Sequence, residues 1–339
     1  MGKKLPTIKE IAKRLNVSVS TVSRALHNHH SIGLRTKTQV QKLAKELNYE
    51  PNQAAIFFKQ GKSFTLGAIL PNLQEEYFSI AINGIEKVAT ANSYNVLISQ
   101  SHDNSDREKQ IVDMMRKSRV DGMIVSVSKN TSNYDHFLQL KDYNIPVVFF
   151  DRAPAISGAH SVICSLKKST VNLIDLLVGN GHKRIGLING PSNITLTRER
   201  VEGYKEGLKK YNLKEEKELI VHTDLTVPGT EKAIGKLLAL KKTPTAVIAF
   251  NDYVALDAIR YARRQGLKIN KDIFFVSYAN LPITYYLDNP PFASVEQFPF
   301  EQAEKATEIL LALINKNDAG SNDKPEKIVL EGEVILHGE

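Results

Sequence analysis

Cysteine is nearly absent from this chain, and long apolar runs are missing altogether. The single cysteine, Cys164, cannot form a disulfide within one chain. No apolar stretch approaches the roughly 18 residues that a membrane-spanning helix requires. The first ten residues, MGKKLPTIKE, lack the apolar segment of a secretory signal peptide. We therefore expect a cytoplasmic protein with no membrane partner, which excludes a standard secreted binding protein.

The chain also lacks the local signatures of common enzyme classes. It contains neither a phosphate-binding P-loop nor a dinucleotide-binding fingerprint. Cys164 lies among apolar neighbours and is interpreted as a small buried residue rather than a nucleophile. His27, His29 and His30 gather without cysteine or acidic partners at metal-ligand spacing. The sequence therefore predicts no enzyme activity, no cofactor and no metal site.

Acidic residues are scarce in the first 62 positions. These positions hold twelve Lys and Arg but only three Asp and Glu, a net charge of +9, whereas the whole chain carries +8. The rest of the chain is therefore nearly neutral. A small basic segment on a large neutral body is typical of a polyanion-binding protein, because Lys and Arg release counterions when they neutralise phosphates.

Three short helices are predicted in this basic segment. Thr7 begins the first as its N-cap, in a capping box with Glu10, and Ser18 caps the second. The third is expected to be capped at Thr36, and apolar residues at helical spacing give all three a shared core. Short hydroxyls and an arginine suit a helix in a major groove, so we predict a helix-turn-helix. The outward face of its second helix holds Val19, Ser20, Ser23 and Arg24.

The run TIKEIAKRLNVSVSTVSRAL, followed by NYEPN, resembles the DNA-binding head of the LacI/GalR family of bacterial transcription regulators. We expect Arg24 and Ser20 to read base edges and the neighbouring hydroxyls to contact phosphates. The predicted DNA-binding residues are Thr7, Ser18, Val19, Ser20, Thr21, Ser23, Arg24, His27, Thr36, Asn52 and Phe58.

A hinge of residues 51–62 is expected after a head of residues 1–50. In family members the matching segment becomes a helix on the operator and inserts a leucine into the minor groove. Phe58 holds that position here and can serve as the intercalating wedge. Alternatively, Phe57 and Phe58 pack under the body. Many relatives have an arginine where this chain has Ile56, a departure that bears on the phosphate contacts of the hinge.

From residue 64 onward, apolar strand-like runs alternate with amphipathic helical runs. Continuously apolar strands indicate parallel sheets covered on both faces, and the alternation indicates doubly wound topology. The body exceeds one comfortable core, so two lobes are expected. The expected strands are 65–70, 94–99, 122–126, 147–150, 184–189, 219–222, 246–250 and 274–277, and the expected helices are 78–92, 106–117, 134–143, 167–179, 196–211, 229–240, 252–265 and 300–315.

The predicted fold class is α/β: a three-helix head with a hinge, followed by a two-lobed, doubly wound, parallel-sheet ligand-binding domain. This body resembles the periplasmic sugar-binding proteins, which share their architecture with the LacI/GalR body. The N-lobe is assigned to residues 63–163 and 294–324, and the C-lobe to residues 164–293 and 325–339.

Ligands of such sheets bind at the carboxyl ends of strands, here in a cleft between the lobes. The resemblance implies effector contacts from Tyr77, Phe78, Ser126, Asp151, Arg152, Arg200, Leu225, Asn251, Ala279 and Gln297. Each of these residues could instead be a structural hydrogen-bonding residue. Relatives often have an effector-binding acid where this chain has Ala279, and another family acid is missing from residues 162–169. The first departure bears on the class of ligand.

The predicted function is a ligand-responsive, sequence-specific repressor of a carbohydrate-utilisation operon. It would bind a double-stranded, pseudo-palindromic operator as a homodimer. A small sugar-like effector would be held chiefly by Arg200 and Asp151 and stacked on Tyr77 or Phe78. Two alternatives stay open: a cytoplasmic sugar-binding or sugar-processing protein without a regulatory role, and a regulator that responds to a purine-type nucleobase.

Overall fold

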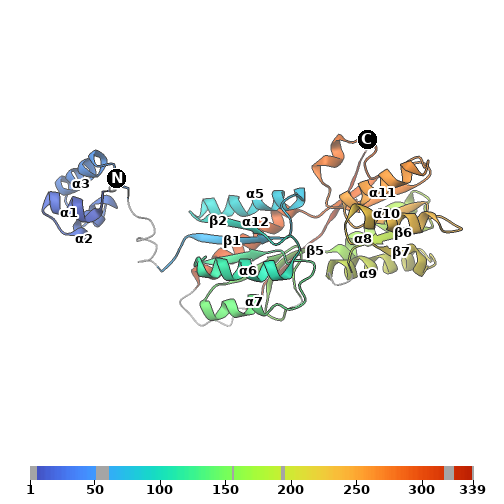
Figure 1. The fold of residues 1–339 in the computed structure, drawn as a ribbon, viewed down its shortest axis with the longest axis horizontal. Coiled ribbons are helices and arrows are strands. Elements are labelled where there is room, and N and C mark those ends of the chain that lie inside the picture. The colour runs from blue at the N-terminus through green and yellow to red at the C-terminus, as the bar shows by residue number, and fades with distance from the viewer. Residues whose placement is uncertain (1–5, 51–60, 155, 192–194, 317–323, 338–339) are drawn as a thin grey trace. The chain divides into compact units, whose positions relative to one another are not determined.

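The chain divides into two compact units, Met1–Ser63 and Phe64–Glu339. Its structure, a computed structural model, describes residues 6–50, 61–154, 156–191, 195–316 and 324–337 (Figure 1). The predicted hinge contacts Asn52, Ile56, Phe57 and Phe58 lie outside the described residues.

The first unit contains the three predicted helices, α1 (Ile8–Leu15), α2 (Val19–Leu26) and α3 (Leu34–Glu46). The side chain of Thr7 caps α1, and that of Ser18 caps α2 by accepting from the Thr21 amide at 3.0 Å. The predicted start of the third helix was wrong, because Gly33 is its N-cap and Thr36 lies in the first turn. The fully buried side chains that join the helices are Ile11, Val22, Ala25 and Val40.

The first lobe of the second unit is a parallel six-stranded sheet in the order β11-β5-β4-β3-β1-β2. Its strands are β1 (Thr65–Leu70), β2 (Asn95–Gln100), β3 (Gly122–Val125), β4 (Val147–Phe150), β5 (His160–Cys164) and β11 (Lys327–Leu330). The strands β1, β3 and β4 are buried on both faces, as predicted from their continuous hydrophobic runs, whereas β2 is half-buried. Leu66 and Leu70 pack in the core beneath α5 (Glu76–Ala91) and α12 (Pro299–Asn315), whereas Ile69 packs against α6 (Ser105–Lys117). The latter face also carries α7 (Asp135–Leu138) and the 3-10 helix η1 (Gln139–Tyr143) (Figure 1).

The second lobe has a six-stranded sheet in the order β12-β10-β9-β8-β6-β7. Its strands are β6 (Ile185–Asn189), β7 (Ile220–His222), β8 (Ala246–Ala249), β9 (Phe274–Tyr278), β10 (Ala293–Glu296) and β12 (Glu333–Leu336). Its helices are α8 (Leu166–Gly179), α9 (Thr195–Lys210), α10 (Val227–Leu238) and α11 (Asp252–Arg264), with short 3-10 segments η2 (Lys217–Leu219) and η3 (Pro282–Tyr286). The two-lobed α/β prediction is confirmed, with one departure: β12 runs antiparallel to β10, so this sheet is mainly rather than wholly parallel.

Sheet membership differs from the predicted lobe boundaries at two places. The boundaries put residues 294–296 in the first lobe, but β10 pairs with β9 and β12 of the second sheet. They put residues 327–330 in the second lobe, but β11 pairs with β5 of the first sheet. The chain therefore passes between the lobes after β5, after β10 and after β11.

Gly203 lies where α9 packs on α8. A Cβ atom at this position would lie 2.3 Å from the backbone oxygen of Lys167, a contact that neither helix backbone can relieve without moving. We expect Gly203→Ala to lower the free energy of unfolding by about 1–3 kcal/mol, as other overpacked interfaces do. Denaturant unfolding of the purified protein measures this loss.

Gly179→Ala is the matched control for this substitution. Gly179 ends α8, and an added Cβ there meets no atom within 4 Å. If the two variants have equal stability, the close approach of α8 and α9 at Gly203 does not limit the packing of the second lobe.

Candidate ligand pocket and DNA-binding surface

The exposed face of α2 has the hydroxyl and arginine character predicted for a recognition helix. Val19 is 40% exposed, and Ser20 and Arg24 are exposed as well. The Ser18 hydroxyl lies 2.7 Å from that of Ser20 and 2.8 Å from that of Thr21, so these groups form one local network. The Arg24 guanidinium has no hydrogen-bond or ion-pair partner among the described residues. It is therefore free to bond a base edge or a phosphate.

Positive groups surround the end of this helix. His27 follows α2 as its C-cap, and its Nδ1 lies 2.8 Å from the Ser23 carbonyl oxygen, which can only accept. The His29 ring stacks on that of His30, with ring centroids 4.3 Å apart. Partial desolvation lowers the pKa of His29, and the positive neighbours His30, Arg24 and Lys37 lower it further. A lowered pKa favours the neutral imidazole of His29, so Arg24 and Lys37 carry the positive charge at this end of the helix.

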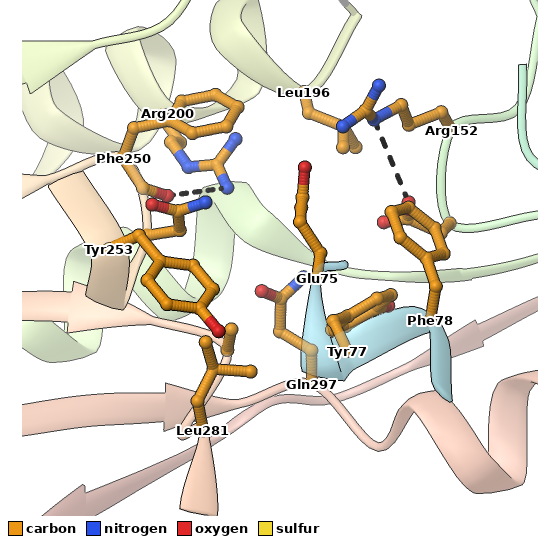
Figure 2. Close-up of a pocket in the computed structure, with 13 residues that line it drawn as sticks. Glu75, Tyr77, Phe78, Arg152, Leu196, Arg200, Phe250, Tyr253, Leu281 and Gln297 are labelled. Atoms are coloured by element: carbon orange, nitrogen blue, oxygen red, sulfur yellow. Dashed lines mark hydrogen bonds and ion pairs between the residues drawn. The ribbon is translucent and has the colours of Figure 1, made fainter. Parts of the chain in front are cut away.

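A pocket lies in the second unit at the carboxyl ends of strands from both sheets (Figure 2). The residues after β4, β8, β9 and β10 reach it, together with the start of α5 and two residues of α9. Thirteen side chains line it: Glu75, Tyr77, Phe78, Asp151, Arg152, Leu196, Arg200, Phe250, Asn251, Tyr253, Ala279, Leu281 and Gln297.

Eight of the ten predicted effector residues are among this lining, and Ser126 and Leu225 are not. The Ser126 hydroxyl donates to the Asp151 carboxylate at 3.1 Å, so it positions a lining residue instead. Leu225 packs against the core of the second lobe. Asn251 has a structural task as well, because its side-chain oxygen caps α11 by accepting from the Val254 amide at 2.9 Å. Ligand contact by the eight stays a prediction.

Arg200 is the most confined charged group of the pocket, with 2% of its surface exposed. Its guanidinium carbon lies 4.1 Å from the Phe250 ring centroid and 4.5 Å from that of Tyr278, and Nη2 donates to the Phe250 carbonyl at 3.1 Å. Nε and Nη1 are buried without a partner among the described residues. Burial lowers the pKa of Arg200. Unpaired buried donors are costly, so an acceptor on a ligand would gain two strong hydrogen bonds here.

Asp151 and Arg152 form the opposite wall. The backbone of Asp151 has φ 56°, in the left-handed region that residues other than glycine seldom adopt. Its amide donates to the side-chain oxygen of Gln302 at 3.3 Å, and burial raises the pKa of its carboxyl. Arg152 donates to Asp103 at 2.6 Å, and its Nε lies 3.9 Å from the Asp151 carboxylate. This wall therefore offers an acceptor whose geometry is fixed by the surrounding hydrogen bonds.

Asp252 holds the loop that carries Ala279. Its carboxylate accepts from the Leu281 amide at 2.6 Å, from the Ser294 hydroxyl at 2.5 Å and from the Ser277 hydroxyl. Burial raises the pKa of Asp252 to about 6, although these three hydrogen bonds oppose the increase. Ala279 has φ 98°, so the loop that lines the pocket takes an uncommon backbone shape that Asp252 supports.

Five lining residues were not predicted: Glu75, Leu196, Phe250, Tyr253 and Leu281. Phe250 and Tyr253 flank the predicted Asn251, so the rule that ligands meet strand ends could have included them. Glu75 precedes Tyr77 in the loop after β1, where an acid is usually interpreted as solvated. The sequence carries no signal for Leu196 or Leu281 beyond their apolar character.

The interpretation of Cys164 as a buried apolar residue is confirmed. The side chain is buried, and burial raises the pKa of its thiol to about 12. A thiol that stays protonated is a poor nucleophile.

Within the described residues no helix is long and apolar enough to cross a membrane.

Comparison with known proteins agrees with both units. Residues 7–52 match the family model of bacterial regulatory proteins of the lacI family. Residues 63–327 match the model described as periplasmic binding proteins and sugar binding domain of the LacI family.

Full-length relatives extend this agreement. The HTH-type transcriptional repressor CytR of Escherichia coli K12 is 31% identical over 98% of this chain and 95% of its own length. The transcriptional repressor PurR of Aliivibrio salmonicida is 28% identical over 91% of this chain and 92% of its own length. Among solved structures, the lac repressor dimer bound to operator and an anti-inducer superposes with a TM-score of 0.83 at 22% identity, over 98% of both chains.

The head match contains all three helices of the first unit, and the body match contains most of both sheets. The protein is a cytoplasmic regulator rather than an enzyme, as the sequence predicts. Its sequence and fold together show that this chain belongs to the LacI family of bacterial regulatory proteins, as a helix-turn-helix DNA-binding transcriptional repressor.

Proposed function

We propose that the chain represses a carbohydrate-utilisation operon by binding operator DNA as a homodimer under the control of a small ring-shaped effector. Two heads would contact two half-sites of a pseudo-palindrome, since one short recognition helix covers only part of a specific site. The effector would bind in the pocket and shift the balance between arrangements of the two lobes. That balance would set operator affinity.

The observation that carries an effector role is the state of Arg200. A buried guanidinium between two aromatic rings keeps two donors that have no partner in the described part of the chain. Asp151 supplies an acceptor on the other wall, and the faces of Tyr77 and Phe78 suit the apolar side of a ring. A polyhydroxylated, sugar-like ring satisfies both kinds of group. The family model's own description names a sugar binding domain.

A homodimer is supported by an exposed aromatic pair in the second lobe. Tyr285 is 87% exposed and Tyr286 is 78% exposed, both on η3, with Ile283 beside them. Clustered exposed apolar side chains mark protein interfaces more often than solvated surface. One solved structure that shares this fold, the lac repressor, is a dimer on its operator.

A purine-type nucleobase is the second candidate effector, and Glu75 favours it. Base recognition calls for a carboxylate that accepts from ring or exocyclic N–H groups, and Ala279 cannot provide one. Glu75 places a carboxylate in the same pocket from the other lobe.

Retention on DNA tests the regulator. The full chain should bind a selected operator with strong salt dependence, whereas a chain that begins at Gly61 should bind none, because it lacks the basic head. Equal retention of both chains would contradict DNA binding by the head. Retention of neither chain would favour a sugar-binding protein without a regulatory role.

Arg24→Ala is expected to cost about 1–3 kcal/mol at one operator position and to relax base preference there, because an exposed arginine on this face can bond guanine bidentately. Binding to a library of operator variants at constant salt measures the effect. Arg14→Ala is the control, since Arg14 is an exposed arginine on α1 that pairs with Glu10. An equal loss on every sequence would make Arg24 a phosphate contact only.

A further inference from the structure

Glu75 lines the pocket, and its carboxylate makes no hydrogen bond or ion pair with a described residue. It precedes α5 at the N-cap position, but its side chain makes no capping hydrogen bond. Its backbone oxygen alone closes the turn, by accepting from the Phe78 amide at 2.9 Å. The side chain instead points into the pocket, toward the space between Arg200 and Arg152 (Figure 2).

The cations around Glu75 are engaged by other groups. Arg152 bonds Asp103 at 2.6 Å and lies 3.9 Å from Asp151, so two carboxylates already share its guanidinium. Lys129 lies 4.0 Å from Asp103 and 3.5 Å from the Asp224 carbonyl. No ion pair joins Glu75 to a described residue.

The electrostatic balance at Glu75 follows from these contacts. Burial is the largest influence and raises the pKa of its carboxyl, Asp103 and Asp151 raise it further, and Arg152 and Lys129 lower it. A partly desolvated carboxylate without a partner costs free energy until a positive or strongly donating group meets it. No described residue supplies such a partner for the Glu75 carboxylate. We therefore expect a bound ligand to supply it.

The opposite side of the pocket has hydrogen-bond donors that need acceptors. Nε and Nη1 of Arg200 are donors for which the described residues provide no acceptor, and the guanidinium lies between the rings of Phe250 and Tyr278. An effector that completes the pocket must therefore present an acceptor toward Arg200 and a donor toward Glu75. Aromatic side chains between these two ends restrict the effector to a flat or ring-shaped body.

We propose that Glu75 determines effector specificity by accepting a hydrogen bond from an amino group on the ring-shaped effector, while Arg200 donates to an acceptor at its other end. The inference rests on the proposed function of this pocket. An ammonium group offsets the negative charge of Glu75, and an amino group on a conjugated ring presents only N–H donors to it, whereas a hydroxyl also presents acceptor lone pairs. The acid that relatives place at Ala279 is thereby replaced by one from the first lobe.

Two ligand types share this chemistry, an amino sugar and an amine-bearing base, and matched probe pairs separate them. We would titrate the full-length protein by calorimetry at neutral pH with D-glucosamine against D-glucose, and with adenine against unsubstituted purine. One amine-bearing probe should bind at least about 10-fold more tightly than its amine-free partner, the scale of one hydrogen bond to a charged group. The pair that shows this preference identifies the ligand type.

Two variants test whether Glu75 causes the preference for the amine-bearing probe. Glu75→Gln keeps the shape and removes the charge, so it should weaken the preferred probe about 10-fold and erase its advantage over the amine-free partner. Glu76→Gln removes the adjacent charge, which lies outside the pocket lining, and should leave both affinities unchanged. The melting temperature without ligand checks that both variants are folded.

Three results would overturn the inference: equal binding of both members of each pair, no binding of either amine-bearing probe, or a preference that survives in Glu75→Gln. The repressor function is judged separately by operator binding of the same preparations. If the protein binds its operator and responds to glucose or unsubstituted purine without any contribution from Glu75, only amine recognition fails. If the full chain does not bind DNA, the proposed function fails instead.

Discussion

Replacing Arg200 with alanine is expected to abolish the effector's influence on operator affinity while operator binding itself persists. The substitution removes a pocket-lining guanidinium, two donors of which have no partner among the described residues, and leaves the head unchanged. Loss of charged hydrogen bonds in a buried site corresponds to about 100-fold or more in effector affinity. The probe is the member of the glucosamine–glucose or adenine–purine pair that raises the melting temperature of the wild-type protein. Operator titrations of the variant are then compared with and without this probe.

Two further variants separate recognition from folding. Arg198→Ala removes an exposed arginine from the same helix and should keep the full response. Arg200→Lys keeps a positive charge between the rings but loses the planar fork of donors, so the protein should stay folded and still lose most of the effector response. A normal response in Arg200→Ala, with operator binding intact, would place the regulatory site outside this pocket.

The predicted strands were most accurate where both faces are buried. The bounds of β1 and β4 match the prediction, because their apolar runs end abruptly at polar or special-backbone residues such as Asp151. The buried strands β5 and β10 were not predicted, and neither were the edge strands β11 and β12. The two edge strands are only half-buried and short, so their apolar residues are too few to stand out from a loop. Each of them pairs with a strand that lies far away in the sequence, after the chain has returned to that lobe. A local sequence pattern cannot indicate such a pairing.

The site was predictable as far as strand ends and family phrases reach. The strand-end rule gave Asp151 and Asn251, and a family phrase gave Arg200. All three residues line the pocket. The tertiary fold was needed for the rest. The stacking of Arg200 between Phe250 and Tyr278 brings together a helix and two strand ends, and this packing is what leaves its donors unpaired. From the sequence alone, Glu75 looks like a solvated loop acid. Only the structure shows that its side chain neither caps α5 nor forms an ion pair with a described residue.

Asp252→Ala is expected to lower the stability of the body by about 3 kcal/mol or more. The substitution leaves the Leu281 amide and the hydroxyls of Ser277 and Ser294 without their shared acceptor, and each buried orphan group costs about 1–3 kcal/mol. For a body of this size the melting temperature should fall by about 6–12 °C. The freed loop also lines the pocket, so effector binding should weaken in the same variant. Asp288→Ala removes an exposed acid of the second lobe and should change neither quantity.

The raised pKa of Asp252 gives this carboxyl a pH dependence with a defined sign. Between about pH 4 and pH 6 the folded protein keeps the proton that the unfolded chain has released, so its contribution to the free energy of unfolding declines as the pH rises and is constant above about 6. The decline amounts to about 3 kcal/mol for a shift of roughly two units. Asp252→Asn cannot titrate, so the difference in stability between wild type and this variant should change across that window. A constant difference from pH 4 to pH 7 would show that Asp252 is ionised throughout and that its three donors outweigh the cost of burial.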